Sequence, residues 1–145
     1  YSDFYPGVVE AIKALSSQGI LMGICSNAES KRLNTWLEQK GLSDIIRCRI
    51  TRDDRKKFKI KPWPEPILGA IVKIKRTYNL GKIDRSKIAF AGDITTDIKA
   101  AKAAKIKAIG VLSGHGYKEE LEKLNPDLII DSVADLPNNL KTLFN

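Results

Sequence analysis

The sequence predicts an α/β protein with a Rossmann-like, three-layer α/β/α architecture, in which helices cover both faces of a parallel sheet. Short apolar runs alternate along the chain with longer stretches whose apolar residues recur at helical spacing. A parallel strand needs a crossover connection, usually a helix, before its neighbour, so this alternation favours parallel pairing. The sequence shows no repeat or linker, and we therefore expect residues 1–145 to form one domain.

Helical periodicity is clearest in residues 6–19, where Val8, Ile12 and Leu15 share a face and a glycine ends the pattern. The same periodicity predicts further helices over residues 28–40, 64–79, 95–105 and 117–124, and a final helix that Ser132 caps.

The apolar runs between these helices predict short, buried, parallel strands. They cover residues 20–25, 45–51, 87–91, 107–112 and 128–130. The strongly charged residues 52–61 interrupt the pattern, and we expect them to form a loop.

The net charge of +8 is concentrated between Arg47 and Lys61. This basic segment holds Arg47, Arg49, Arg52, Arg55, Lys56, Lys57, Lys59 and Lys61. Two interpretations stay open: a solvated loop, or a positive field that attracts anionic substrates or nucleic acid. Apart from Phe58 and Trp63, no aromatic side chains are interleaved for base stacking, so nucleic acid is the less favoured partner.

The sequence also bears on the cellular setting. No apolar run has the length of a membrane span, and the opening residues do not resemble a targeting segment, so we expect no membrane association and a cytoplasmic location. Cys25 and Cys48 lie in apolar, strand-like contexts, which indicates buried free thiols, with a disulfide or a metal pair as the alternative.

Two carboxylates follow the predicted strand at residues 87–91. Asp93 comes directly after Gly92, and Asp97 lies four residues further on. Ligands bind at the carboxyl ends of strands in open α/β sheets. Two acidic groups across a tight turn suit a hard cation, so Mg²⁺ is the expected metal, although Mn²⁺ or Co²⁺ could replace it. The structural alternative is an N-cap aspartate followed by an acid that the helix dipole favours.

Two further polar features accompany the predicted elements. Ser26 and Asn27 follow residues 20–25, where a hydroxyl and backbone N–H groups can cradle a phosphate, although Ser-Asn is also an ordinary helix cap. Lys61 stands in the sequence Lys-Pro-Trp-Pro, whose prolines stiffen the chain and would hold the ammonium near a phosphate. The alternative for Lys61 is an exposed lysine before a proline-rich helix start.

In this order, the three features resemble motifs of the haloacid dehalogenase-like hydrolase superfamily. Ser26 looks like its second motif and Lys61, within Lys-Pro-x-Pro, looks like its third. Gly92-Asp93-x-x-x-Asp97 looks like its fourth motif. The residues after 107 are similar to the tail of phosphoglycolate-phosphatase-like members, so the resemblance covers nearly the whole chain.

The resemblance implies a role for each residue. Ser26 would hydrogen-bond the transferring phosphoryl group with help from the Asn27 N–H, and Lys61 would bridge the nucleophile and the phosphate. Asp93 would bind Mg²⁺, and Asp97 would complete or orient the metal site. The implied protein is a Mg²⁺-dependent phosphoric monoester hydrolase that acts on a small phosphorylated substrate through an aspartyl-phosphate intermediate.

The superfamily's first motif, an Asp-x-Asp at a strand end that supplies the nucleophile, is missing from this sequence. Asp3 is no substitute, because no apolar strand precedes it and no second aspartate follows two residues later. In the family's sheet, the first-motif strand lies between the strands that end at Ser26 and at Gly92. Without it, two half-sheets with unpaired inner edges would remain. We expect the chain, which begins at Tyr1, to be the C-terminal part of a longer phosphatase whose N-terminal part holds the first motif and a helical cap. The alternatives are a strand from a partner chain, or a fold that has closed up without the strand.

A rival function follows from the missing first motif. A non-catalytic protein that binds a phosphorylated ligand or a partner would also lack a nucleophile. His115, between two glycines, is expected to be a loop residue, with a substrate contact as the alternative.

Overall fold

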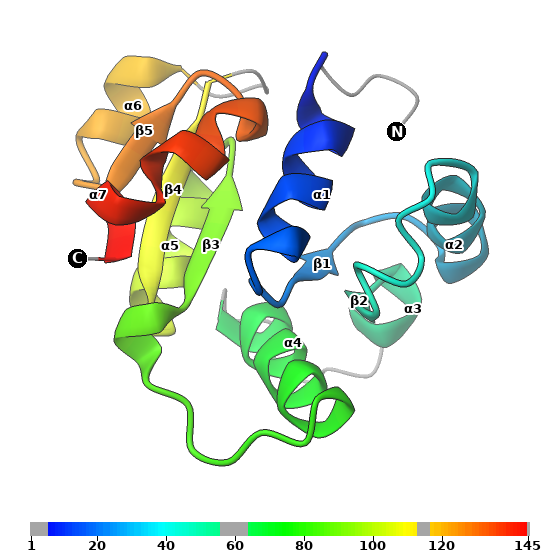
Figure 1. Cartoon of the computed structure of the whole chain (residues 1–145). Helices are drawn as coiled ribbons and strands as arrows, with labels where there is room; N and C mark the ends of the chain where they lie inside the picture. The colour runs from blue at the N-terminus through cyan, green and yellow to red at the C-terminus, as the bar shows by residue number, and fades with distance from the viewer. Residues whose placement is uncertain (1–5, 56–63, 113–116, 145) are drawn as a thin grey trace.

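The computed structural model describes residues 6–55, 64–112 and 117–144, where helices and strands alternate as predicted (Figure 1). The α-helices are α1 (Val8–Ser17), α2 (Ser30–Gln39), α3 (Arg52–Arg55), α4 (Pro64–Thr77), α5 (Thr95–Ala103), α6 (Lys118–Glu122) and α7 (Leu140–Phe144). The strands are β1 (Gly23–Cys25), β2 (Cys48–Ile50), β3 (Ala89–Gly92), β4 (Lys107–Val111) and β5 (Leu128–Ile130). Two short 3-10 helices are η1 (Arg85–Lys87) and η2 (Val133–Asn139).

The strands form two parallel sheets rather than one. β1 pairs with β2, and the second sheet has the order β3-β4-β5. In Figure 1, α1 runs between the β3-β4-β5 sheet on the left and the β1-β2 pair on the right. The parallel α/β class is therefore confirmed. The division falls where the family resemblance implies it, between the strand before Ser26 and the strand that ends at Gly92.

The strands beside this division are less buried than a strand paired on both edges. β4 lies between β3 and β5, and its residues 108–111 are all buried. No residue of β1 or β3 is fully buried, and Gly23 and Ala91 are exposed. Within the described parts of the chain, β1 and β3 each pair with a strand on one edge only. The other edge of each can therefore accept a further strand.

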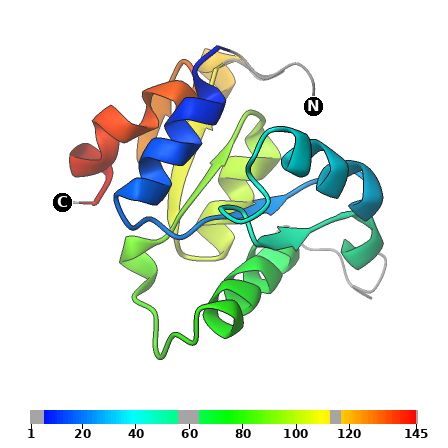
Figure 2. The ribbon, with the colours of Figure 1, turned by 45° about the vertical axis from the view of Figure 1, so that its right-hand side comes forward.

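Helices on two sides join the sheets (Figure 2). On one side α1 contacts η2, and Ile12 of α1 shares an apolar cluster with Leu33 of α2 and the partly buried Val133 of η2. On the other side α4 contacts both strands of the first sheet as well as α5, where Ile67 packs with Ile98. Apolar packing between helices thus holds together two sheets that share no backbone ladder within the described part of the chain.

Helix α3 corrects one expectation. The predicted loop over residues 52–61 is wrong for residues 52–55, and the rest of it lies outside the described residues. The buried Thr51 donates its N–H and its hydroxyl to the Asp54 carboxylate, at 2.9 and 3.1 Å. These bonds close one helical turn directly after β2. The sequence interpretation missed this local cap because basic residues dominate the segment.

The predicted C-terminal helix forms in two parts, η2 and α7. Ser132 is its N-cap as expected, since its hydroxyl accepts the N–H of Ala134 at 3.1 Å. Pro137 lies inside η2. Because proline has no N–H to donate, it interrupts regular α-helical bonding, and the tighter 3-10 form occupies this stretch.

Within the described residues neither Cys25 nor Cys48 forms a disulfide, and the expected burial holds fully for Cys48 but only in part for Cys25. Cys48 is buried, whereas Cys25 is half-buried and donates from Sγ to the Pro66 carbonyl at 3.6 Å. Among the helices of the described residues, none has the length and apolarity needed to cross a bilayer.

Candidate functional site

Asp97 closes the turn that follows β3. Its Oδ2 atom accepts the N–H of Asp93 at 3.0 Å and the N–H of Ile94 at 3.2 Å. The N–H of Asp97 donates in return to the Ile94 carbonyl at 3.0 Å. The carboxylate also stands at the start of α5, where the helix dipole favours negative charge. The side chain thus orders the turn that carries Asp93, while direct metal binding by Asp97 stays a prediction.

Gly92 provides the space that this arrangement needs. A Cβ atom built on Gly92 would lie 2.2 Å from Cβ of Asp97 and 2.4 Å from its Cγ and Oδ2 atoms. Heavy atoms do not approach so closely, so the Asp97 side chain packs directly on the glycine backbone. The spacing Gly-Asp-x-x-x-Asp therefore has a packing reason, because the second aspartate reaches back across the glycine to the amide of the first.

Burial raises the pKa of the Asp97 carboxyl above its usual value of 3.8. The hydrogen bonds from Ile94 and Asp93 lower this pKa in part, and the charge of Asp93 raises it. A raised folded-state pKa contributes stability that is fully present below the unfolded-state pKa. That stability is lost as the pH rises through the folded-state pKa. At neutral pH the turn therefore holds a partly desolvated charge that opposes folding when no cation is bound.

Asp97→Asn is expected to increase the free energy of unfolding of the metal-free protein at neutral pH. The amide oxygen can still accept both N–H bonds, and the desolvated charge is gone. The gain should shrink as the pH falls below the raised pKa, where the wild-type carboxyl is protonated. Urea unfolding in EDTA across a pH series measures the difference, with the exposed Asp131→Asn as the matched control. Lower stability of Asp97→Asn at every pH would contradict this account.

Ser26 is a buried hydroxyl at the end of β1, with 7% of its surface exposed. Its N–H donates to the Ile50 carbonyl at 2.8 Å, and its Oγ accepts the N–H of Ala28 at 3.0 Å. The second bond is a local turn contact and not a helix cap, since α2 begins at Ser30 with Glu29 at its N-cap, so the helix-cap alternative for Ser26 and Asn27 is wrong. The adjacent Asn27 is exposed. The structure thus fixes the position of Ser26, and phosphate binding by Ser26 and Asn27 stays a prediction.

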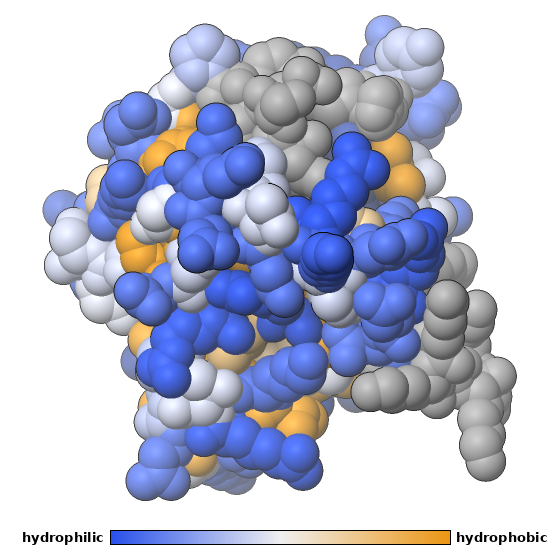
Figure 3. All heavy atoms as spheres, turned by 90° about the vertical axis from the view of Figure 1, so that its right-hand side faces the viewer, coloured by the Kyte–Doolittle hydropathy of each residue, from blue (hydrophilic) through white to orange (hydrophobic). Residues whose placement is uncertain are grey.

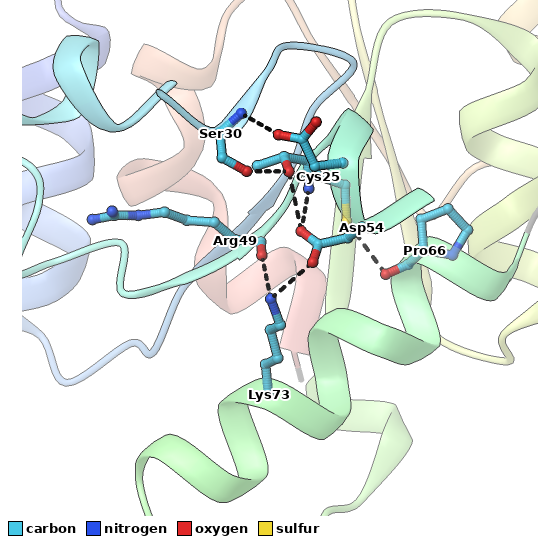
Figure 4. Close-up of polar contacts among 8 residues, drawn as sticks. Cys25, Ser30, Arg49, Asp54, Pro66 and Lys73 are labelled. Atoms are coloured by element: carbon cyan, nitrogen blue, oxygen red, sulfur yellow. Dashed lines mark hydrogen bonds and ion pairs between the residues drawn. The ribbon is translucent and has the colours of Figure 1, made fainter. Parts of the chain in front are cut away.

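A polar cluster beside this turn escaped the sequence interpretation (Figure 4). Ser30, at the start of α2, donates its N–H to the Asp53 carboxylate at 3.0 Å, and its hydroxyl lies 2.7 Å from the Thr51 hydroxyl. Lys73 of α4 lies 3.7 Å from the Asp54 carboxylate. The one available signal was a pair of aspartates inside a strongly basic segment, directly after a predicted strand.

The donor types at the β3 turn fit Mg²⁺, although the described residues form no complete site. In the described ranges, no three His, Cys, Asp or Glu residues gather into a group that could hold a metal. Mg²⁺ in proteins commonly takes only one or two carboxylates and completes its shell with water and substrate phosphate. Oδ2 of Asp97 accepts two N–H bonds of the turn, and metal binding by Asp93 and Asp97 stays a prediction.

Lys61 lies outside the described residues, and so do Asp3, Trp63 and His115. The roles expected for Lys61 and His115, and the rejection of Asp3 as the nucleophile, therefore stay predictions from the sequence. The elements on either side of Lys61 are described: α3 ends at Arg55, before Lys61, and α4 begins at residue 64, after Lys61.

Several arginines of the basic segment bind other parts of the chain. Arg49 donates hydrogen bonds of 2.8 Å to two backbone carbonyls and one asparagine side chain. Arg47 lies over the ring of Tyr78, 5.4 Å from its centroid, and Arg52 pairs with Glu29. Figure 3, which views the right-hand side of Figure 1, shows mostly hydrophilic side chains on its coloured surface. These contacts give part of the positive charge a structural use, and the choice between a solvated loop and an anion-attracting field stays a prediction for the rest of the segment.

Comparisons with known proteins agree with the motif pattern. Residues 1–111 match the family profile described as haloacid dehalogenase-like hydrolase. The phosphoglycolate phosphatase of Agrobacterium fabrum is 36% identical over 132 residues, which is 91% of this chain and 52% of that protein. The phosphoglycolate phosphatase of Pectobacterium atrosepticum is 29% identical over 135 residues, 93% of this chain and 54% of that protein. The chain thus spans about half the length of the curated relatives it matches.

Solved structures share the fold. A predicted phosphoglycolate phosphatase from Haemophilus somnus superposes with a TM-score of 0.71 at 27% identity, covering 92% of this chain and 56% of that one. A haloacid dehalogenase superfamily hydrolase from Ehrlichia chaffeensis gives 0.69 at 28% identity, covering 97% of this chain and 58% of that one.

Proposed function

This chain belongs to the haloacid dehalogenase-like hydrolase family, and on that premise we propose that the complete protein is a Mg²⁺-dependent phosphatase of small phosphomonoesters. The observation that carries the proposal is the ordered Gly-Asp-x-x-x-Asp turn at the end of β3, with its paired acids. The names of the relatives make phosphoglycolate the first substrate to test. A cytoplasmic setting is part of the same proposal, and cell fractionation tests it.

The proposal gives each residue a task. Asp93 and Asp97 would hold Mg²⁺, which supplies positive charge against the phosphoryl oxygens when bound. Ser26 and the Asn27 N–H would hold the phosphoryl group, and Lys61 would place a positive charge between that group and the nucleophile. Asp97 also accepts the N–H groups of Asp93 and Ile94, and these bonds would hold the β3 turn in place during turnover.

The nucleophile must come from outside these 145 residues, because the sequence contains no Asp-x-Asp. We place it on a strand between β1 and β3, each of which has an edge that pairs with no other strand of the described residues. An aspartate on that strand would attack phosphorus, the ester oxygen would leave with a proton, and water would then hydrolyse the aspartyl-phosphate. In this proposal, residues 1–145 would be the C-terminal part of a longer phosphatase.

Hydrolysis of p-nitrophenyl phosphate and phosphoglycolate by the complete protein, with Mg²⁺ or with EDTA, tests the function. We expect turnover that depends on Mg²⁺ and is lost in EDTA. No turnover of either compound, or of a panel of small phosphomonoesters, would overturn the proposal.

Lys61→Ala is expected to lower kcat of the complete protein about a hundredfold or more, because it removes preorganised charge at the phosphate. Steady-state kinetics with Mg²⁺ measure the loss, and Lys82→Ala, at an exposed position, is the control. Near-normal turnover would return Lys61 to the structural interpretation.

The absence of Asp-x-Asp also supports a second candidate, a non-catalytic protein that binds a phosphorylated ligand or a partner. The intact mass of the natural protein separates the two. A mass well above 16.1 kDa would leave room for the missing strand, whereas a mass of 16.1 kDa would favour the binding protein.

A further inference from the structure

The turn that carries Ser26 and the segment that follows β2 are joined by their backbones. The Ser26 N–H donates to the Ile50 carbonyl at 2.8 Å, and the Arg52 N–H donates to the Ala28 carbonyl at 3.0 Å. The first bond closes the β1-β2 pairing at Ile50, the last residue of β2, and the second lies beyond the ends of both strands. Residues 26–28 and 50–52 therefore form one hydrogen-bonded unit.

Side chains extend this unit into the start of α2. N-terminal N–H groups of a helix have no partner within the helix, and Asp53 supplies one by accepting the Ser30 N–H at 3.0 Å. The hydroxyls of Ser30 and Thr51 lie 2.7 Å apart. Thr51 is only 2% exposed, so its polar atoms depend on these partners.

Asp54 sets the direction of the hydrogen bonds in the cluster. Its Oδ2 atom accepts the N–H of Thr51 at 2.9 Å and the hydroxyl of Thr51 at 3.1 Å. A carboxylate only accepts, so the single hydroxyl hydrogen of Thr51 goes to Asp54, and the Ser30 hydroxyl must donate to Thr51. The chain of donors therefore runs from Ser30 through Thr51 to Asp54.

Asp54 also faces α4. Its Oδ1 atom lies 3.7 Å from Nζ of Lys73, which donates to the Arg49 carbonyl at 2.8 Å (Figure 4). Both side chains of the ion pair are partly exposed, at 44% and 24%, so the charge attraction is screened and contributes little by itself. The hydrogen bonds to the buried Thr51 are the stronger part of the arrangement.

We propose that Asp54, acting through Thr51, is a positioning residue for the phosphate-binding turn at Ser26, which it holds in register with β2 and α4. The inference rests on the proposed phosphatase function. Asp54 touches no reacting atom in this account. Its effect is on the placement of the turn. Small displacements of groups that position a substrate can reduce the rate of the reaction.

Steady-state kinetics of the complete protein with p-nitrophenyl phosphate and Mg²⁺ test the inference. Asp54→Ala and Thr51→Val should each lower kcat about 10- to 100-fold and change KM less than about threefold. Thr51→Ser, which keeps the hydroxyl, should restore most of the rate. The kcat of the double variant should lie within about twofold of the kcat of the slower single variant, since both changes remove the same contact. Asp44→Ala, an exposed acid in the same half of the chain, is the control.

Amide hydrogen exchange gives a readout that does not depend on turnover. Exchange at residues 26–30 should become faster in Asp54→Ala and Thr51→Val, and stay as in wild type in Asp44→Ala and Thr51→Ser. If Asp54→Ala does not fold, the comparison of Thr51→Val with Thr51→Ser decides the question alone. An active wild type whose Asp54→Ala and Thr51→Val variants match Asp44→Ala in kcat, or leave exchange at residues 26–30 unchanged, would overturn this inference only. An inactive wild type would overturn the proposed function and this inference with it.

Discussion

Asp93→Asn is expected to abolish the Mg²⁺-dependent turnover of the complete protein, with a loss of about a thousandfold or more in kcat. The change replaces a carboxylate with a neutral amide, which is a poorer ligand for a hard cation. The turn itself should survive, because the substitution keeps the backbone N–H of Asp93, which donates to Oδ2 of Asp97 at 3.0 Å. The variant therefore separates metal binding from folding.

Two measurements check this expectation. The first is kcat with p-nitrophenyl phosphate over a range of Mg²⁺ concentrations. The second is the rise in unfolding temperature that Mg²⁺ causes in the wild type, which the variant should lose. Asp131→Asn is the matched control, since Asp131 is an exposed acid directly after β5 in the same sheet. Full turnover in Asp93→Asn would remove Asp93 from the metal site.

The order of helices and strands could be predicted from the sequence because each element carries its own pattern. Residues 128–130 form β5 with the predicted bounds, since acids and a proline limit the short apolar run. Helix α4 starts at the predicted residue 64 and ends two residues before the predicted end, at Thr77. In both elements local composition and tertiary packing favour the same structure, which is the condition under which sequence patterns predict well.

Strand starts were harder to predict because the partner decides where pairing begins. The predicted strand over residues 20–25 starts at Gly23, which pairs with Cys48. The N–H of Ile20 still donates to the Leu15 carbonyl of α1. The N–H groups of Ile45 and Ile46 donate to the Leu42 carbonyl in a turn, which delays β2 to Cys48. Apolarity alone carries no information about these competing bonds.

The candidate site also has features that the sequence predicts and features that it does not. Its residue types and order follow from the sequence, because Ser26 and Asp93 each stand directly after an apolar run. The positioning role that we propose for Asp54 does not follow from the sequence. It depends on a contact with Thr51 and, through Thr51, with Ser30 in another element. Contacts between residues far apart in the chain leave no periodic signal, and the nearest clue was two acids among many bases.

Gly92→Ala is expected to lower the free energy of unfolding by about 3 kcal/mol or more and to remove Mg²⁺-dependent turnover. The new Cβ would need the space that Asp97 now fills, since three atoms of that side chain lie within 2.4 Å of it. Asp97 would have to move, and the N–H groups of Asp93 and Ile94 would then lose the oxygen that accepts both of them. Urea unfolding and kcat of the complete protein measure the two effects.

Gly110→Ala offers a matched control, because Gly110 stands opposite Gly92 in the β3-β4 register. A Cβ on Gly110 would lie 3.5 Å from side-chain atoms of Ile129 and Leu121, an ordinary contact, so the change in stability should stay within about 1 kcal/mol. Adding Asp97→Gly to Gly92→Ala removes all three of the close atoms and should recover part of the lost stability without recovering turnover. If the double variant is as unstable as Gly92→Ala alone, the clash with Asp97 is not the cause. If Gly92→Ala behaves like Gly110→Ala, the turn can open without cost, and the packing reason given for its Gly-Asp-x-x-x-Asp spacing fails.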